Sequence, residues 1–595
     1  MTVTYSVVPE HLREHLFHVR CRVAEPDPTG QVFRLPSWIR GSYLVRDFAK
    51  HVLQLRAECA GQPVAIERLD KRSFRCAPVA GALTLDYRVY AYDESVRKAW
   101  LDPRRGFFNG SSLFYCPVGR EPGPFEVELA RPQDAAGADW RVATTLTAVQ
   151  VDAAGFGLYR ASDYEELIDH PVEMGAHRQL DFDVDGVPHA LVLAGRVDEL
   201  DEARLRADLT AICRVERALF GGEPKLDRYL FLTHVVANGY GGLEHRSSTA
   251  LICARGDLPR LGDARRSRDY RAFLGLCSHE YFHLWNVKRI TAQRFLKSDL
   301  GAEAYTRDLW HYEGATSYYD DLFLLRAGIL DADSYLDVVA ETATRLERTP
   351  GRLQQTLADA SFEAWIKHYQ PDENTPNQAI SYYVKGAIVA LCLDLRLRRD
   401  SRVTLDDVMR QLWRKYGATG RGVPEGGLEA VAQQLSGLDL RAFFDQALRT
   451  TGELPLAELL ADFGVRAERR IATGEADAGG RNTAPALSVY LGLRLRAGEL
   501  RVAQVLSGSP AARAGIAVND QLLALDGLRL SANGWSARLQ SLQPGRPVAL
   551  HLFRDDELLV LDVVPEAPPA DTWTLTLADT ADAMVLARRK AWLGA

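Results

Sequence analysis

The spacing of hydrophobic residues changes twice along the 595-residue sequence, and this limits the chain to domains of different kinds. Residues 1–163 form short alternating runs broken by Gly, Pro and Asp, which is typical of a β-sandwich-like domain. An amphipathic helix is predicted over 198–222, and a mostly helical region follows over 268–464. Short alternating runs return over 487–565. The pattern therefore predicts a multidomain α+β protein.

The breaks in this pattern predict the domain boundaries. The segment 472–485 is rich in Gly, Ala and polar residues, interrupts the apolar periodicity and is the expected linker. We expect an N-terminal β-rich domain over 1–165, a mostly helical domain over 166–466, a small β module over 480–566, and a C-terminal tail over 567–595.

Composition excludes several classes of protein. Lys and Arg number 72 against 79 Asp and Glu, a formal net charge of -7 without long blocks of one sign. Nucleic acid is therefore not an expected partner, since phosphate binding leaves a basic footprint. No run of about 18 apolar residues predicts a membrane span, and the N-terminus lacks the pattern of a secretory signal. We expect no membrane partner and a cytoplasmic location.

The eight cysteines include no CxxC pair, and we expect most to be reduced core residues.

The most informative motif is the HExxH string that runs from His279 through Glu280 to His283 in a predicted helix. Positions i and i+4 lie on one face of an α-helix, so both imidazoles can reach one metal ion. Glu280 lies about 100° round the helix from His279, where a carboxylate can act as a base on water beside the metal. The string predicts two zinc ligands and a general base. Polar positions on an amphipathic helix are the alternative.

A catalytic zinc site needs a third protein ligand and an open fourth position. The downstream candidates are Asp299, Glu303, Asp308 and Glu313. We choose Glu313, because it lies on a second predicted helix whose apolar face includes Trp310 and Tyr318. Glu303 is the main alternative.

Trp310, Glu313 and Gly314 form a W-x-x-E-G pattern, and with HExxH the chain resembles the gluzincin metallopeptidases. Further strings are similar to one gluzincin family, the PDZ-containing glycyl aminopeptidases, number sixty-one among metallopeptidases. They cover residues 38–43, 46–48, 107–110, 241–245 and 283–289. Arg40 stands where that family usually has proline in W-x-P-G-S-Y. The resemblance implies a thermolysin-like catalytic domain, one zinc ion (Zn2+) and a preference for small N-terminal residues, Gly or Ala.

An aminopeptidase has to recognise a free α-ammonium group, and a carboxylate near the zinc does so by a charge-assisted hydrogen bond. Glu244 is the candidate, although a solvated Glu after a hairpin turn is the alternative. In related aminopeptidases a Gly-x-Met-Glu-Asn edge strand does this work, and Gly241, Gly242 and Glu244 resemble it. His245 takes the place of the asparagine there. It either contacts the substrate, to orient it or to stabilise developing charge, or is a structural histidine.

The oxyanion that develops during peptide hydrolysis needs a hydrogen-bond donor opposite the zinc. Tyr383 opens the string Tyr-Val-Lys-Gly, which matches the Y-x-K-G string of the resembling gluzincins. The resemblance implies that Tyr383 stabilises the tetrahedral intermediate. Neighbouring Tyr382 is the alternative register, and packing without a catalytic role is the other interpretation.

The last region is similar to protease-associated PDZ domains. The matching strings are residues 491–493 and 507–527. Such domains add an extended peptide to a sheet edge and capture its terminal carboxylate with backbone amides. A peptide or protein ligand is therefore an expected partner, unless the module only packs on the catalytic body.

These motifs together predict a zinc-dependent aminopeptidase that hydrolyses the N-terminal bond of peptide substrates with zinc-activated water. Two alternatives belong to other functional classes. One is a PDZ-type peptide-binding scaffold with an inactive metallopeptidase body. The other is a gluzincin hydrolase acting on a non-peptide electrophile such as an epoxide.

Overall fold

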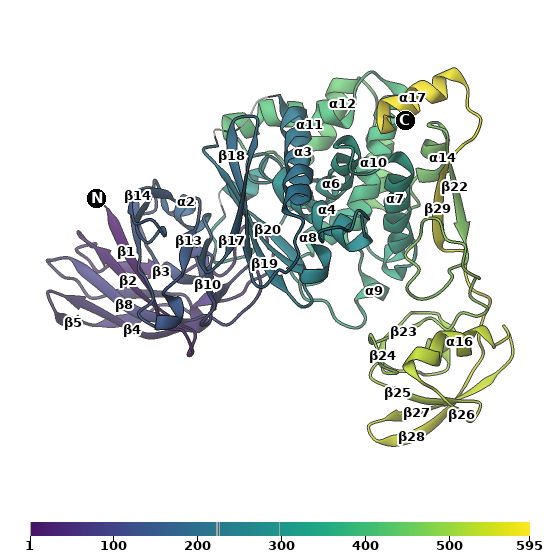
Figure 1. Ribbon diagram of the computed structural model, residues 1–595, viewed down its shortest axis with the longest axis horizontal. Helices are drawn as coiled ribbons and strands as arrows, with labels where there is room; N and C mark the ends of the chain where they lie inside the picture. The colour runs from purple at the N-terminus through teal and green to yellow at the C-terminus, as the bar shows by residue number, and fades with distance from the viewer. Residues whose placement is uncertain (1, 222–223, 225, 297, 595) are drawn as a thin grey trace. The chain divides into compact units, whose positions relative to one another are not determined.

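The computed structural model describes residues 2–221, 224, 226–296 and 298–594 (Figure 1). The chain forms two compact units, one of residues 1–304 and 413–423 and one of residues 305–412 and 424–595. Within the described part of the chain, no helix combines the length and the apolar character that crossing a membrane requires.

The N-terminal region of the first unit is built from strands, drawn in purple and blue in Figure 1. In β1 (Val3–His11), Val3, Tyr5 and Val7 are buried while the residues between them are half-buried, as in a sheet with one face on a core. The prediction of an N-terminal β-rich domain is confirmed. The largest sheet has the order β14 (Thr147–Val151), β15 (Gly157–Ala161), β12 (Phe125–Leu129), β1, β2 (Leu16–Val23), β8 (Leu83–Tyr90), β4 (Val52–Cys59), β5 (Gln62–Val64).

A second, five-stranded sheet follows in the same unit. Its order is β17 (Arg178–Val184), β18 (Val187–Ala194), β19 (Tyr229–Val236), β21 (Ser248–Ala254), β20 (Tyr240–Glu244). The strands β18, β19 and β21 are parallel, and β20 pairs antiparallel with β21 at the edge. The helix predicted over 198–222 is confirmed as α3 (Glu202–Phe220), which connects the parallel strands β18 and β19.

The helix α4 (Arg268–Phe282) packs against β20, β21 and α3 (Figure 1). Its N-cap, Ser267, accepts a hydrogen bond from the Tyr270 amide at 3.0 Å, which satisfies one of the unpaired donors of the first turn. Because β20 packs against α4, this edge strand lies beside the helix in which the HExxH string begins.

The second unit is mostly helical, with α6 (Ala315–Arg326), α7 (Ala332–Glu347) and α10 (Tyr382–Asp400) at its centre. Residues Trp310–Gly314, expected in an ordinary helix, instead form one π-helical turn that leads into α6. Such turns widen a helix locally and are frequent at functional sites. This turn packs on α10 at two glycines, because a Cβ on Gly314 would lie 2.5 Å from the Gly386 Cα. No side chain separates the two backbones there.

The C-terminal module has its own core, which includes Val502, Leu522, Leu550 and Trp535. Two strands, β23 (Leu493–Leu495) and β24 (Val502–Val505), form one sheet. The other sheet has the order β26 (Leu528–Arg529), β25 (Gln521–Leu525), β27 (Val548–Arg554), β28 (Glu557–Val563), and α16 (Trp535–Gln540) completes the module.

The segment 567–595 is structured over most of its length. It contains β29 (Thr572–Leu577) and α17 (Ala583–Leu593). The strand β29 pairs with β22 (Val465–Arg470), which lies before the β module in the sequence. The module is therefore inserted between two paired strands of the second unit.

All eight cysteines are free thiols, and all except Cys59 are buried. The prediction of reduced core cysteines is thus confirmed.

Candidate active site

The histidines of the HExxH string lie at the C-terminal end of α4. His279 is in its last turn, and His283 is the C-cap residue with helical φ of −61°. The two rings lie edge to face, with 4.6 Å between centroids and an interplanar angle of 89°. The Nδ1 of His283 lies 2.5 Å from the Asn286 carbonyl oxygen. Since a carbonyl only accepts, Nδ1 carries the proton, and Nε2 is the nitrogen that can bind a metal.

Apolar side chains surround the end of α4. Four of them, Tyr281, Phe282, Leu284 and Trp285, are at most 1% exposed. This surface excludes water from the back of the site, and charged groups interact more strongly where water is excluded.

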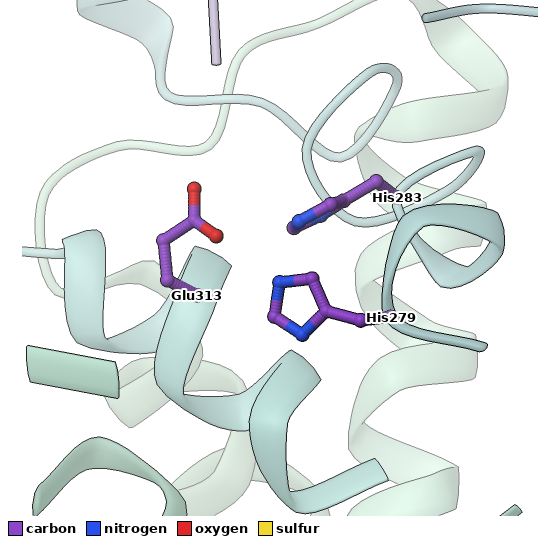
Figure 2. Close-up of side chains that lie close together, drawn as sticks. All are labelled: His279, His283 and Glu313. Atoms are coloured by element: carbon purple, nitrogen blue, oxygen red, sulfur yellow. The ribbon is translucent and has the colours of Figure 1, made fainter. Parts of the chain in front are cut away.

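Glu313 lies on the π-helical turn and is buried. Together with His279 and His283 it offers ligand atoms that all lie within 4.8 Å of one another. Figure 2 shows the carboxylate directed toward the two imidazoles. Two imidazoles and a carboxylate are the ligand set of a catalytic zinc site, so the residues fit this metal. Among the described residues, the alternatives Asp299, Glu303 and Asp308 belong to no such group.

A second group of close side chains lies entirely in the first unit. Potential ligand atoms of Glu244, Glu280 and His283 also lie within 4.8 Å of one another, and all three residues are buried. Glu244 is the last residue of β20, the edge strand beside α4. The predicted amine-binding carboxylate and the predicted base thus lie next to the second histidine.

Two glycines allow these carboxylates to lie close to the backbone. A Cβ on Gly242 would overlap the Glu280 carboxylate, and a Cβ on Gly41 would overlap that of Glu244. Gly41 also has φ of +89°, which other residues rarely adopt. The close approach of Glu280 is therefore a physical reason for glycine at position 242. The close approach of Glu244 is the corresponding reason at position 41, which follows Arg40 in the N-terminal motif.

His245 lies in a buried charged cluster centred on Asp169. The Asp169 carboxylate lies 2.6 Å from Lys288 Nζ and 3.6 Å from His245 Nδ1, and it accepts a hydrogen bond from the Arg246 amide at 2.8 Å. Burial alone would raise the pKa of Asp169, but Lys288, His245 and Arg246 together lower it well below 3.8. Asp169 therefore joins three segments: the end of α2 (Tyr164–Ile168), the end of β20 and the turn after α4.

Replacing Asp169 by Asn should lower the free energy of unfolding by about 3–5 kcal/mol, because it leaves the buried Lys288 ammonium without its counter-charge. Urea unfolding of the full chain measures this. Since folding lowers the pKa of Asp169, its contribution is complete above about pH 4 and is lost as the pH falls further. The difference between the wild type and D169N should therefore shrink in acid.

The matched control is Asp263→Asn, which removes the same charge from an exposed pair with Arg265 at 3.0 Å. Exposed pairs contribute little, so this variant should unfold almost as the wild type does. Equal effects of the two substitutions would contradict a structural role for the Asp169 cluster.

The two tyrosines at the start of α10 differ in exposure. Tyr382 is fully buried, whereas Tyr383 is half-buried. Burial raises the pKa of the Tyr383 phenol well above 10, and the nearby Glu313 carboxylate raises it further. The phenol is therefore a protonated hydrogen-bond donor at neutral pH. Its partial exposure and its proximity to Glu313 favour Tyr383 over Tyr382 as the oxyanion donor.

A cavity adjoins Glu244 within the first unit. Its lining includes Trp38, Gly41, Tyr43, Asp169, Glu244 and Phe295. It offers about 70 Å³ to the centres of water molecules, roughly half of the 150 Å³ that accommodates a benzene molecule in an engineered protein cavity. Arg40 connects two parts of the cavity lining. Its guanidinium donates hydrogen bonds to the Phe295 carbonyl and, at 2.8 Å, to the Glu165 carboxylate.

Sequence reasoning missed Asp169 and Asn286. Asn286 contributes only a backbone carbonyl, which no residue-type motif reveals. Asp169 is 119 residues from Lys288 in the chain and in no motif, so only the folded structure brings the two together.

The chain is similar to known protein families. Three family models match: the Peptidase M61 N-terminal domain over residues 4–176, the M61 glycyl aminopeptidase over 272–389, and the PDZ domain over 489–564. Among curated proteins, no sequence matches the chain.

The chain is also similar to solved structures. A crystal structure of an aminopeptidase N family protein from Idiomarina loihiensis is similar at 37% identity over 99% of this chain and 100% of that one, with a TM-score of 0.95. An M1 zinc metallopeptidase from Deinococcus radiodurans is similar at 14% identity over 77% of this chain and 95% of that one, with a TM-score of 0.48.

Proposed function

Because the chain belongs to the M61 glycyl aminopeptidase family of zinc metallopeptidases, we propose that it removes small residues, Gly or Ala, from the free N-termini of peptides. The resemblance inferred from the sequence motifs is thereby confirmed, and so is the PDZ domain. The observation that carries the proposal is the position of the Glu244 carboxylate beside Glu280 and His283.

One zinc ion fits the site, and His279, His283 and Glu313 are the residues that would hold it. Bound zinc supplies Lewis-acid chemistry, which polarises a carbonyl group and acidifies water. The Asn286 carbonyl fixes the tautomer of His283 for this role.

Glu244 is the residue proposed to bind the substrate α-ammonium group. Its carboxylate is buried, and ligand atoms of Glu280 and His283 lie within 4.8 Å of it. A buried carboxylate attracts a cation more strongly than an exposed one does. A peptide anchored there by its amine presents its first peptide bond, and no later bond, to Glu280. His245 follows Glu244 in the chain, and its Nδ1 lies 3.6 Å from the Asp169 carboxylate. This contact favours a structural role for His245 over direct substrate contact.

The cavity beside Glu244 is the proposed site for the side chain of the first residue. Its small volume suits hydrogen or methyl and disfavours large aromatic side chains. This geometry supports the proposed preference for Gly and Ala.

The proposed reaction assigns separate tasks to two residues. Glu280 takes a proton from the attacking water and later delivers it to the leaving amine. Tyr383 donates a hydrogen bond to the oxyanion that forms at the former carbonyl oxygen. Both side chains lie in partly or fully buried surroundings, where such interactions are stronger than in water.

The PDZ domain is the proposed site for a second peptide. Leu491 and Gly492 directly precede β23, and Gly492 has φ of +74°, a conformation that suits glycine. Peptide addition to β23, with backbone amides of this segment on the terminal carboxylate, is the mode that PDZ domains use.

A hydrolysis profile tests the proposed function. Peptides that begin with Gly, Ala, Leu or Phe are compared, each with a free and with an acetylated amine. We expect turnover of free Gly and Ala peptides, loss of activity with a chelator and recovery with zinc. Equal hydrolysis of acetylated peptides would contradict an aminopeptidase, and opening of an epoxide without peptide release would favour the non-peptide alternative.

A further inference from the structure

Lys385 is a buried charged residue that the proposed reaction does not use. It lies two residues after Tyr383 on α10, so the two side chains point to different sides of the helix. The residue is 3% exposed. Its ammonium forms no hydrogen bond or ion pair with any residue that the structure describes. Among the described residues, Lys288 also has a side chain that is only 6% exposed, but it is paired with Asp169.

A cavity within the second unit lies next to Lys385. The charged and aromatic residues of its lining are Glu347, Arg352, Lys385, Glu453, Arg469 and Trp573. It offers about 40 Å³ to the centres of water molecules, several times the 10–15 Å³ that one water requires. The cavity is therefore large enough for a small ligand.

The other charges of this lining are already paired with each other. Arg352 lies 2.9 Å from Glu347 and 2.5 Å from Glu453. Arg469 lies 3.3 Å from Glu347 and stacks over the Trp573 ring at 4.7 Å. Three cations thus meet two carboxylates, and the ammonium of Lys385 is the excess positive charge.

The low exposure of the Lys385 residue affects the pKa of its ammonium group. Burial lowers the pKa of Lys385 to about 8, with a partial offset from Glu453 and a further lowering from Arg352. The group is still mostly charged at neutral pH. The Nζ is not among the side-chain atoms that are both fully buried and without a hydrogen bond, so it is accessible from the cavity. An anion in the cavity would give it a charge-assisted hydrogen bond.

We propose that this cavity binds a small carboxylate, of the size of formate or acetate, whose oxygen atoms accept hydrogen bonds from Lys385 Nζ. One excess positive charge matches one negative charge, whereas Glu347 and Glu453 repel a dianion such as phosphate. The rest of the lining, which includes Leu346, Ile388 and Leu454, suits the apolar end of a carboxylate. The site is separate from the peptidase chemistry and does not depend on the proposed function.

The full chain is tested by thermal unfolding at pH 7 in sodium formate, acetate, trimethylacetate, phosphate or chloride at equal ionic strength. Formate and acetate should raise the melting temperature saturably above its value in chloride, because a ligand that binds only the folded state stabilises it. Trimethylacetate, which is too bulky, and phosphate should not raise the melting temperature. The shift should weaken as the pH rises through about 8, where Lys385 loses its proton.

Lys385→Met should abolish the formate and acetate shifts. The matched control is Lys367→Met, which removes a half-exposed lysine paired with Glu363 at 2.7 Å and should leave them unchanged. Equal shifts in wild type and K385M, or no saturable shift in the wild type, would overturn the proposal.

A second measurement needs no variant. Reductive methylation of the lysines of the wild type, which releases no carboxylate, is quantified peptide by peptide, with and without formate. Bound formate should slow modification of Lys385 several-fold and leave that of Lys367 unchanged. Equal slowing at both lysines would reject the site even if K385M does not fold.

Discussion

Replacing Glu280 by Gln is expected to lower kcat by about 10²–10⁴-fold while the protein keeps its metal. Glu280 is not in the ligand group of His279, His283 and Glu313, so its charge is not needed to hold zinc. Glutamine has nearly the same size and keeps the close packing against Gly242, but it cannot take a proton from water. The measurements are kcat on an Ala-starting peptide and zinc content by elemental analysis.

The matched control for this change is Glu216→Gln. Glu216 is also a fully buried carboxylate in the first unit, and it accepts a hydrogen bond from Ser278 at 2.8 Å. This control should keep its turnover number even if it unfolds at a lower temperature. A fully active E280Q would eliminate Glu280 as the base, and loss of zinc from E280Q would show a structural role instead.

Glu244→Gln is expected to lower kcat/KM for free-amine peptides by about 10–100-fold, the effect of losing a hydrogen bond between charged groups. The preference for free over acetylated substrates should fall by a similar factor, because the amide no longer attracts the ammonium group. Both values come from kcat/KM on matched pairs of Ala-starting peptides.

The acetylated substrate is the internal control for E244Q. Its slow hydrolysis should change little, because it has no ammonium group to lose. If both substrates decline by the same factor, Glu244 acts on the common chemical step and amine recognition lies elsewhere. Glu303→Gln is a useful companion, since Glu303 is exposed and should affect neither substrate.

The parts of the site that the sequence predicted are those set by local geometry. The HExxH spacing places two imidazoles on one helical face whatever the rest of the fold does. The alternation of β1 and the amphipathic pattern of α3 likewise depend only on which face is buried. Glu313 was predicted as the third zinc ligand because it lies on the second predicted helix. In the structure, its potential ligand atom lies within 4.8 Å of those of His279 and His283.

The features that the sequence did not predict depend on tertiary contacts. The π-helical turn at Glu313 has the composition of an ordinary helix, and its extra width is visible only in the backbone hydrogen bonds. Asp169 and Gly41 belong to the N-terminal region, far in sequence from the residues that they contact. The ammonium of Lys385 has no hydrogen-bond or ion-pair partner in the part of the chain that the structure describes, and no sequence motif indicates such an absence.

The close approach of Gly314 and Gly386 has a consequence for how much the catalytic geometry can vary. One glycine follows the proposed zinc ligand Glu313, and the other lies three residues after the proposed oxyanion donor Tyr383. Since their backbones touch, α10 cannot slide or tilt without moving the turn that bears Glu313. Thermal fluctuations should therefore displace these two groups in concert, and the distance between them should stay constant even when either one moves relative to the substrate.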